Sequence, residues 1–148
     1  MISHKNVIAN VLQAEIFEAV ARRENGIETQ VILGLLPLSH IYGLTLVALL
    51  AQHRGDEVII LPRFELDTFL AAVQYFKIEQ LNVVPPILIQ MLSNPEKCDK
   101  TDLSSVRFIF SGAAPLGSEL VEDMLKKYPK FRIGQGYGKK TALLPTIH

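Results

Sequence analysis

The sequence predicts an α/β fold, namely a mostly parallel β-sheet with helices on both of its faces. Short continuous apolar runs, which are typical of strands covered on both sides, alternate along the chain with segments in which apolar residues recur every three to four positions. Such alternation favours parallel strands joined by right-handed helical crossovers. The length of 148 residues suits one domain.

Each expected element is marked by its periodicity and by the residues that end it. The helices should span residues 4–23, 42–54, 66–77, 86–93 and 117–128, and the strands residues 30–36, 57–61, 81–84, 106–110 and 131–135. The first helix is amphipathic, with a potential N-cap at Ser3 and a basic last turn before Asn25 and Gly26. The first strand ends at Pro37, and the apolar helix after it ends at Gly55.

Proline residues and charge placement define the later elements. The second strand stops at Pro62, and the helix after it has one apolar face. Pro85 closes the third strand and opens a short helix. The fourth strand is a buried apolar run, and the helix after it has acidic residues early and lysines late, which suits its dipole. The fifth strand leads into a glycine-rich loop.

The composition excludes several classes of protein. Fifteen basic and fifteen acidic residues cancel, and no basic stretch is long enough to bind nucleic acid. The one cysteine, Cys98, cannot form an internal disulfide, which suits a reducing compartment. It falls in the charged stretch 94–105, so we expect Cys98 to lie in a surface loop and its thiol to be unreactive.

Two further segments bear on the location of the protein. The apolar run 31–51 is long enough to raise the question of a membrane span, but Pro37, Ser39 and His40 interrupt it. A strand followed by a helix explains the run better. The N-terminus has no apolar core of a secretory signal. We therefore expect a cytoplasmic protein with no transmembrane segment and no nucleic-acid partner.

The first candidate site is the segment Ser111-Gly112-Ala113-Ala114-Pro115-Leu116-Gly117. It links the fourth strand to the last helix and has almost no side-chain bulk. Ligands of open α/β sheets bind at the carboxyl ends of strands, and a flat ring could lie against the bare backbone there. An ordinary tight connection between a strand and a helix is the alternative interpretation.

Two other segments are candidates. The segment 36–43 places His40 and Tyr42 just past the first strand, where a lone histidine is more often structural than catalytic and a tyrosine more often belongs to the core. The glycine-rich segment 134–138 invites comparison with a dinucleotide fingerprint, but Lys139 occupies the position of the third glycine. The glycines indicate instead a close approach to another backbone or to a ligand.

Taken together, five motifs resemble the adenylate-forming enzymes, most closely their branch of 4-coumarate–CoA ligases and acyl-CoA ligases. In the order and approximate spacing of that family, the motifs are residues 36–43, Val84-Pro85-Pro86-Ile87, Asp102-Leu103-Ser104-Ser105, residues 111–117 and Gly134-Gln135-Gly136-Tyr137-Gly138. The resemblance implies that residues 1–138 are a fragment of the large N-terminal AMP-binding domain. Residues 139–148 form an unmatched C-terminal tail.

The resemblance also implies a role for individual residues. Gly112, Ala113 and Ala114 would flank the adenine, and His40 would be the catalytic residue near the carboxylate. Substrate would also contact Tyr42, Gly136 and Tyr137. The full set of nucleotide- and CoA-binding residues would be Gly112, Ala113, Ala114, Gln135, Gly136, Tyr137 and Arg63, the last of which matches a position that meets the phosphates of CoA.

The chain also departs from the family pattern. It begins just after the loop that holds the triphosphate, and it has Lys139, Lys140 and Thr141 where the family has Met-Thr-Glu, whose Glu supports Mg²⁺. The later ribose-binding Asp and the C-terminal lid domain are absent as well. The implied cofactors are ATP or AMP, CoA and Mg²⁺, with an incomplete Mg²⁺ site and no metal ligand assigned here.

The implied reaction converts a small-molecule carboxylate, ATP and CoA to acyl-CoA, AMP and pyrophosphate, in phenylpropanoid or fatty acid metabolism. Some relatives are peroxisomal, but this chain has no C-terminal peroxisomal signal. Because of the missing parts we expect the chain to be inactive alone. The alternative is a non-catalytic α/β module that binds a nucleotide or a partner chain through an exposed sheet edge.

Overall fold

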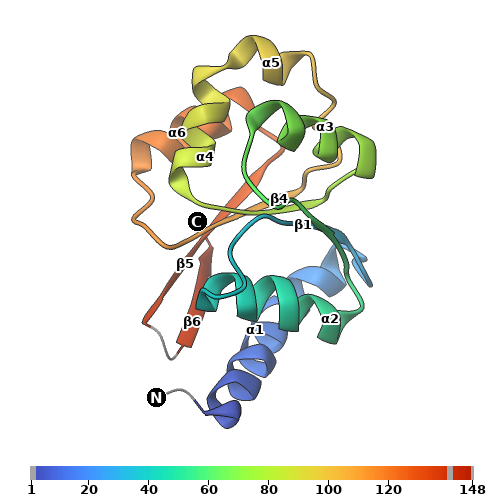
Figure 1. The fold of residues 1–148 in the computed structure, drawn as a ribbon, viewed down its shortest axis with the longest axis vertical. Coiled ribbons are helices and arrows are strands. Elements are labelled where there is room, and N and C mark those ends of the chain that lie inside the picture. The colour runs from blue at the N-terminus through green and yellow to red at the C-terminus, as the bar shows by residue number, and fades with distance from the viewer. Residues whose placement is uncertain (1–2, 140–141, 148) are drawn as a thin grey trace.

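The computed structural model describes residues 3–139 and 142–147, and it confirms the predicted fold class (Figure 1). The helices are α1 (His4–Glu24), η1 (Gly43–Leu50), α2 (Ala51–Arg54), α3 (Leu66–Phe76), α4 (Pro85–Ser93), α5 (Pro95–Asp99) and α6 (Ser118–Lys127). The strands are β1 (Val31–Gly34), β2 (Glu57–Ile60), β3 (Gln80–Val83), β4 (Phe108–Ser111), β5 (Arg132–Lys139) and β6 (Ala142–Ile147).

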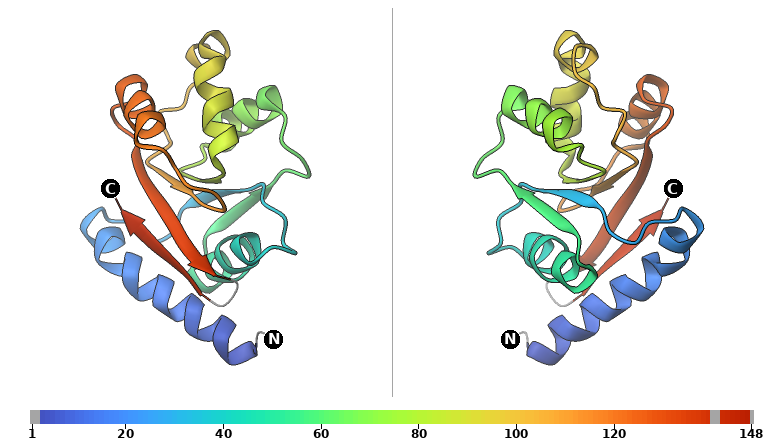
Figure 2. Two further views of the ribbon diagram at one scale, coloured as in Figure 1. Left: turned by 90° about the vertical axis from the view of Figure 1, so that its left-hand side faces the viewer. Right: turned by 90° about the vertical axis from the view of Figure 1, so that its right-hand side faces the viewer.

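The strands form one sheet in the order β2-β1-β3-β4-β5-β6. The first five are parallel, and β6 runs antiparallel to β5. Helices α3 to α6 cover one face of the sheet, while α1, η1 and α2 lie on the other, as Figures 1 and 2 show. The chain therefore has three layers, as expected for parallel strands that must be covered on both sides.

The core is divided by the sheet into two clusters. The larger lies on the side of α3 to α6 and centres on Leu33, Leu81 and Ile109, one from each of three central strands and each fully buried. The smaller joins α1, η1 and β4 and includes Tyr42 and Phe110, whose rings pack edge to face. Among the described residues, no helix is both long and apolar enough to cross a membrane.

Helix α1 begins as predicted but is covered less than expected. Ser3 caps it, because its hydroxyl accepts from the Asn6 amide while the Asn6 side chain accepts from the Ser3 amide. Val11 and Ala14 are buried. The large apolar side chains that stay exposed are Ile8, Leu12, Ile16, Phe17 and Val20. The apolar residues occupy more of the helix circumference than the sheet side of the helix can cover.

Two predictions for the middle of the chain were incomplete or wrong. The helix predicted over 42–54 consists of a π-helix, η1, followed by one turn of α-helix. The stretch 94–105 was expected to be a loop with Cys98 on its surface, but Pro95 opens the short helix α5. Cys98 is only 1% exposed, and its thiol donates to the Met91 carbonyl at 3.4 Å.

The C-terminal part of the sheet differs most from the prediction. Residues 134–138 were expected to be a loop, but they continue β5, which pairs with β6 over 142–147. Part of the predicted tail 139–148 is therefore a strand. A glycine-rich segment gives no alternating side-chain pattern, so only its backbone pairing reveals it as a strand. The remaining strands and helices begin and end within two residues of their predicted bounds.

Candidate functional site

The carboxyl ends of the parallel strands meet at one edge of the sheet. β4 ends at Ser111, which lies beside Val83 at the end of β3 and beside Gln135 in β5. The segments 111–117 and 134–138 are therefore neighbours at this edge, as predicted, although the second is a strand. This is the edge at which open α/β sheets bind ligands.

The turn after β4 presents backbone and methyl groups to solvent. Gly112 is buried, and its amide donates to the Val83 carbonyl at 3.3 Å. Ala113 and Ala114 are exposed, and Ala113 has a φ of 66°, which is unusual for a residue with a side chain. Strained backbone of this kind clusters at functional sites. The turn thus offers a flat, uncrowded surface beside Gln135.

Tyr42 supports this turn from the core of the protein. Its side chain is 1% exposed, and its hydroxyl lies 2.7 Å from the Phe110 carbonyl and 3.1 Å from the Val83 carbonyl. A Cβ atom at Gly112 would lie 3.0 Å from the Tyr42 ring. Burial raises the pKa of Tyr42 well above its usual range, so the hydroxyl is a neutral donor. Tyr42 thus belongs to the core and supports the site.

His40 is exposed on the loop between β1 and η1. Its Nδ1 accepts from the Tyr42 amide at 3.2 Å, and its own amide donates to the Pro37 carbonyl at 3.0 Å. In the neutral imidazole the proton therefore sits on Nε2. The Nε2–H group is the part of the ring left for a ligand. That His40 faces the turn at 111–117 stays a prediction.

Arg63 is also exposed, but it follows the edge strand β2. Three strand steps separate β2 from β4 in the sheet, which is about 14 Å. Next to Arg63 lies an apolar pocket of about 270 Å³ formed by the ends of β1 and β2. Arg63 therefore lies too far away to meet a base at Ala113, and it would meet only a ligand that extends along the edge.

The predicted residues of β5 are placed by their strand pairing. Gln135 is half-buried beside Ser111, Gly136 lies opposite Pro145, and the backbone of Tyr137 lies opposite Leu144. The side chain of Tyr137 lies outside the described residues, as do Lys140 and Thr141 of the departure from Met-Thr-Glu. In the part of the chain that the structure describes, no three acidic, histidine or cysteine side chains gather to hold a metal.

The burial of the Ser111 side chain was not predicted from the sequence. Its hydroxyl is fully buried, and it has no hydrogen-bond partner among the described residues. It lies directly beneath the exposed turn, at the end of β4. A serine within a run of small residues carries no sequence signal for such a position, because the same composition suits any tight turn.

Known proteins are similar to this chain over nearly its whole length. The family model described as AMP-binding enzyme matches residues 1–140. The chain is 42% identical over 139 residues to a probable 4-coumarate–CoA ligase of Dictyostelium discoideum, covering 93% of this chain and 24% of the relative. It is 37% identical over 147 residues to an acyl-CoA ligase of Emericella nidulans, covering 99% of this chain and 25% of that relative.

The solved structures agree with these relatives. A long-chain-fatty-acid–CoA ligase of Archaeoglobus fulgidus superposes with a TM-score of 0.79 at 25% identity, over 98% of this chain and 30% of that one. MatB of Rhodopseudomonas palustris, at 22% identity and a TM-score of 0.81, shares the fold over the whole of this chain and 28% of its own.

This chain spans about a quarter of the length of the curated relatives it matches. The family model covers nearly all of it, and the motifs at the carboxyl edge lie within the matched residues. The chain therefore belongs to the AMP-binding enzyme family and is homologous to its 4-coumarate–CoA and acyl-CoA ligases.

Proposed function

We propose that this chain carries the adenine-binding edge of an acyl-CoA ligase and does not catalyse adenylation by itself. The observation that carries the proposal is the exposed turn at Ala113, with its left-handed backbone, next to Gln135 at the carboxyl edge of the sheet. The base would lie against Gly112, Ala113 and Ala114. Gln135 and the backbone that follows it, Gly136 and Tyr137, would run along the nucleotide.

The remaining ligands would lie farther along the same edge. His40 would donate its Nε2–H to the substrate carboxylate, and Tyr42 would act indirectly by holding the turn at Gly112. Arg63, beyond the apolar pocket at the ends of β1 and β2, would meet the phosphates of CoA. ATP supplies the adenylyl group and CoA the thiol in this reaction. The substrate is a small carboxylic acid of phenylpropanoid or fatty acid metabolism, and the cytoplasm is the proposed compartment.

The proposed lack of activity follows from incomplete neutralisation of the charge on the nucleotide phosphates. Nucleotidyl transfer depends on groups that position the phosphates and neutralise their charge. This chain has Thr141 where the family has the glutamate that supports Mg²⁺, and Lys139 adds positive charge without ordering a metal. If the glutamate that the family has where this chain has Thr141 contributed about 2.7–4 kcal/mol, its replacement would slow the reaction roughly 10²- to 10³-fold.

Two measurements on the purified chain test this proposal. Titration with AMP, followed by NMR, should show weak binding of about 1–10 mM, because the site buries little of the ligand. Ala113→Trp should abolish binding, whereas Ala71→Trp, at an exposed position on α3, should not. No AMP binding in the unchanged chain would refute the adenine site. Carboxylate-dependent exchange of ATP with pyrophosphate, lost in Ala113→Trp, would refute the proposed lack of activity.

A further inference from the structure

A second hollow lies at the opposite edge of the sheet, where the strands begin. It is a pocket of about 310 Å³ between α1 and the first residues of β3, β4 and β5. Its lining residues are Glu18, Ala21, Arg22, Asn25, Ile27, Gln30, Gln80, Arg107, Phe108, Lys130 and Arg132. The length of β4 separates it from the turn at Ala113, a distance of about 10 Å or more.

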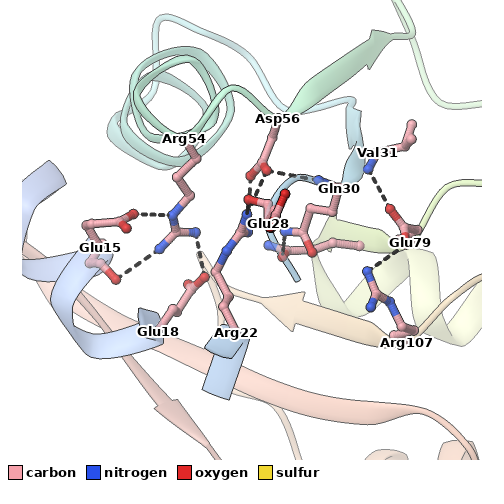
Figure 3. Close-up of polar contacts among 12 residues, drawn as sticks. Glu15, Glu18, Arg22, Glu28, Gln30, Val31, Arg54, Asp56, Glu79 and Arg107 are labelled. Carbon is pink, nitrogen blue, oxygen red and sulfur yellow. Dashed lines mark hydrogen bonds and ion pairs between the residues drawn. The ribbon is translucent and has the colours of Figure 1, made fainter. Parts of the chain in front are cut away.

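Two cations of this pocket have no counter-charge. Arg22 is paired with Asp56 at 2.9 Å and Arg107 with Glu79 at 2.6 Å, as Figure 3 shows. Glu18 is the acidic residue of the lining, and Arg54 engages it at 2.6 Å. Lys130 and Arg132 are exposed and pair with no carboxylate among the described residues. The pocket therefore has a positive rim that attracts an anion.

The pocket also has a fixed polar wall. The Nε–H of Arg107 is shut off from solvent and has no acceptor among the described residues. An anion in the pocket does not reach this shielded N–H, so the exposed charges of Lys130 and Arg132 are the ones that it meets. Gln30 donates to Gln80 at 2.6 Å, and Gln80 donates to Asn82 at 3.0 Å. These bonds hold the amide wall rigid.

Apart from Asn25, the rest of the lining is apolar. Ile27 and Phe108 are half-buried beside Ala21, and the Phe108 ring rests at a tilt against Phe110. The volume lies at the low end of the range for small-molecule sites. An inorganic anion would leave this apolar surface unused, whereas a small molecule with one apolar end and one anionic end would use both parts of the pocket.

We propose that this pocket binds a small organic carboxylate. Its carboxylate lies at Lys130 and Arg132, and its apolar body packs against Phe108 and Ile27. The site is separate from the proposed adenine-binding edge, because the two lie at opposite ends of the same strands. Binding here does not depend on AMP, so the two proposals can fail independently.

Benzoate is the probe, titrated into the ¹⁵N-labelled full chain. We expect saturable shifts of the amide signals of Ile27, Phe108 and Arg132, with Ala113 unchanged, and weaker binding as NaCl is raised. Benzyl alcohol lacks the charge, and inorganic phosphate lacks the apolar body. Each should bind at least about tenfold more weakly than benzoate. Equal binding of either one, or shifts at Ala113 alone, would overturn the proposal.

Two double variants test which basic side chains bind the carboxylate of benzoate. Lys130→Gln combined with Arg132→Gln should weaken benzoate binding about tenfold or more, because two charge-assisted contacts are lost. The matched control, Lys100→Gln combined with Lys126→Gln, removes the same charge from exposed positions outside the pocket and should leave the affinity unchanged. Saturating AMP should also leave it unchanged. Equal losses in both double variants, or competition by AMP, would contradict the assignment.

Discussion

At the scale of single residues, Tyr42 shows how a core side chain determines the shape of a surface site. Its one hydroxyl lies near two carbonyls, at the ends of β3 and β4, and its ring fills the space that a side chain at position 112 would need. The turn that offers Ala113 to solvent therefore rests on a residue that solvent does not reach. His40, the proposed ligand contact, and Tyr42, which supports the turn, lie two positions apart in the chain.

Tyr42→Phe tests this support. The variant keeps the ring but removes the hydroxyl, leaving the carbonyls of Val83 and Phe110 without that donor, so we expect a loss of about 1–3 kcal/mol in the free energy of unfolding. Tyr75→Phe is the control, because Tyr75 is 79% exposed and should change stability by less than about 0.5 kcal/mol. Urea denaturation measures both. Equal losses in the two variants would contradict a stabilising hydrogen bond from the Tyr42 hydroxyl.

At the scale of elements, the start of η1 is set by a close approach between backbones. A Cβ atom at Gly43 would overlap the carbonyl oxygen of Pro37 and would lie 2.9 Å from that of Leu36. The loop that carries His40 therefore folds back tightly onto the first turn of the helix. Only a residue without a side chain permits this path, which brings Tyr42 under β3 and β4.

Gly43→Ala makes this constraint measurable. In an open helix, replacing glycine with alanine raises stability by about 1 kcal/mol. Here we expect the opposite, a loss of about 1–3 kcal/mol by urea denaturation, because the new methyl group meets backbone that cannot move aside. Gly117→Ala meets no atom within 4 Å and should cost less than about 1 kcal/mol. A Gly43→Ala chain as stable as the unchanged one would contradict the proposed contact.

At the scale of the whole molecule, ion pairs attach α1 to the rest of the fold. The Arg54 side chain is 4% exposed and donates to Glu15 and to Glu18 (Figure 3). It also donates to the Ala14 carbonyl. Arg22 pairs with Asp56, which also accepts from the Gln30 amide. Few apolar side chains of α1 are buried, so these ion pairs are the polar contacts that link the helix to α2 and to Asp56 before β2.

This attachment should depend on pH. Burial tends to raise the pKa of Glu15, but the hydrogen bond and charge of Arg54 outweigh it, so the pKa lies below its ordinary value of 4.5. The contribution of Glu15 to stability is therefore present above about pH 4.5 and is lost as the pH falls through the lowered pKa. Glu15→Gln should lower the urea midpoint at about pH 6 but should differ less from the unchanged chain at about pH 3.

The control for this pH dependence is Glu24→Gln. Glu24 lies on the same helix, is exposed and forms no ion pair within the described ranges. Its variant should follow the unchanged chain at both pH values. If Glu15→Gln does the same, Arg54 does not hold α1 through that carboxylate.

The local sequence by itself determined most of the helices and strands, although not α5, β6 or the extension of β5, and it identified the family. Apolar periodicity, N-caps and prolines act within a few residues, so they place α3 and β3 without any knowledge of their neighbours. The five ordered motifs likewise needed only their sequence, and the match over residues 1–140 confirms the family that they indicate.

Only the tertiary structure decided the strand order, the pairing of β5 with β6, the burial of Cys98 and the place of Tyr42 beneath Gly112. Each depends on residues far apart in the chain, as when the Tyr42 hydroxyl meets the Phe110 carbonyl. The same is true of the basic pocket, which draws its lining from α1 and from the starts of three strands. Local sequence patterns do not predict such contacts, because packing and backbone pairing between distant segments create them.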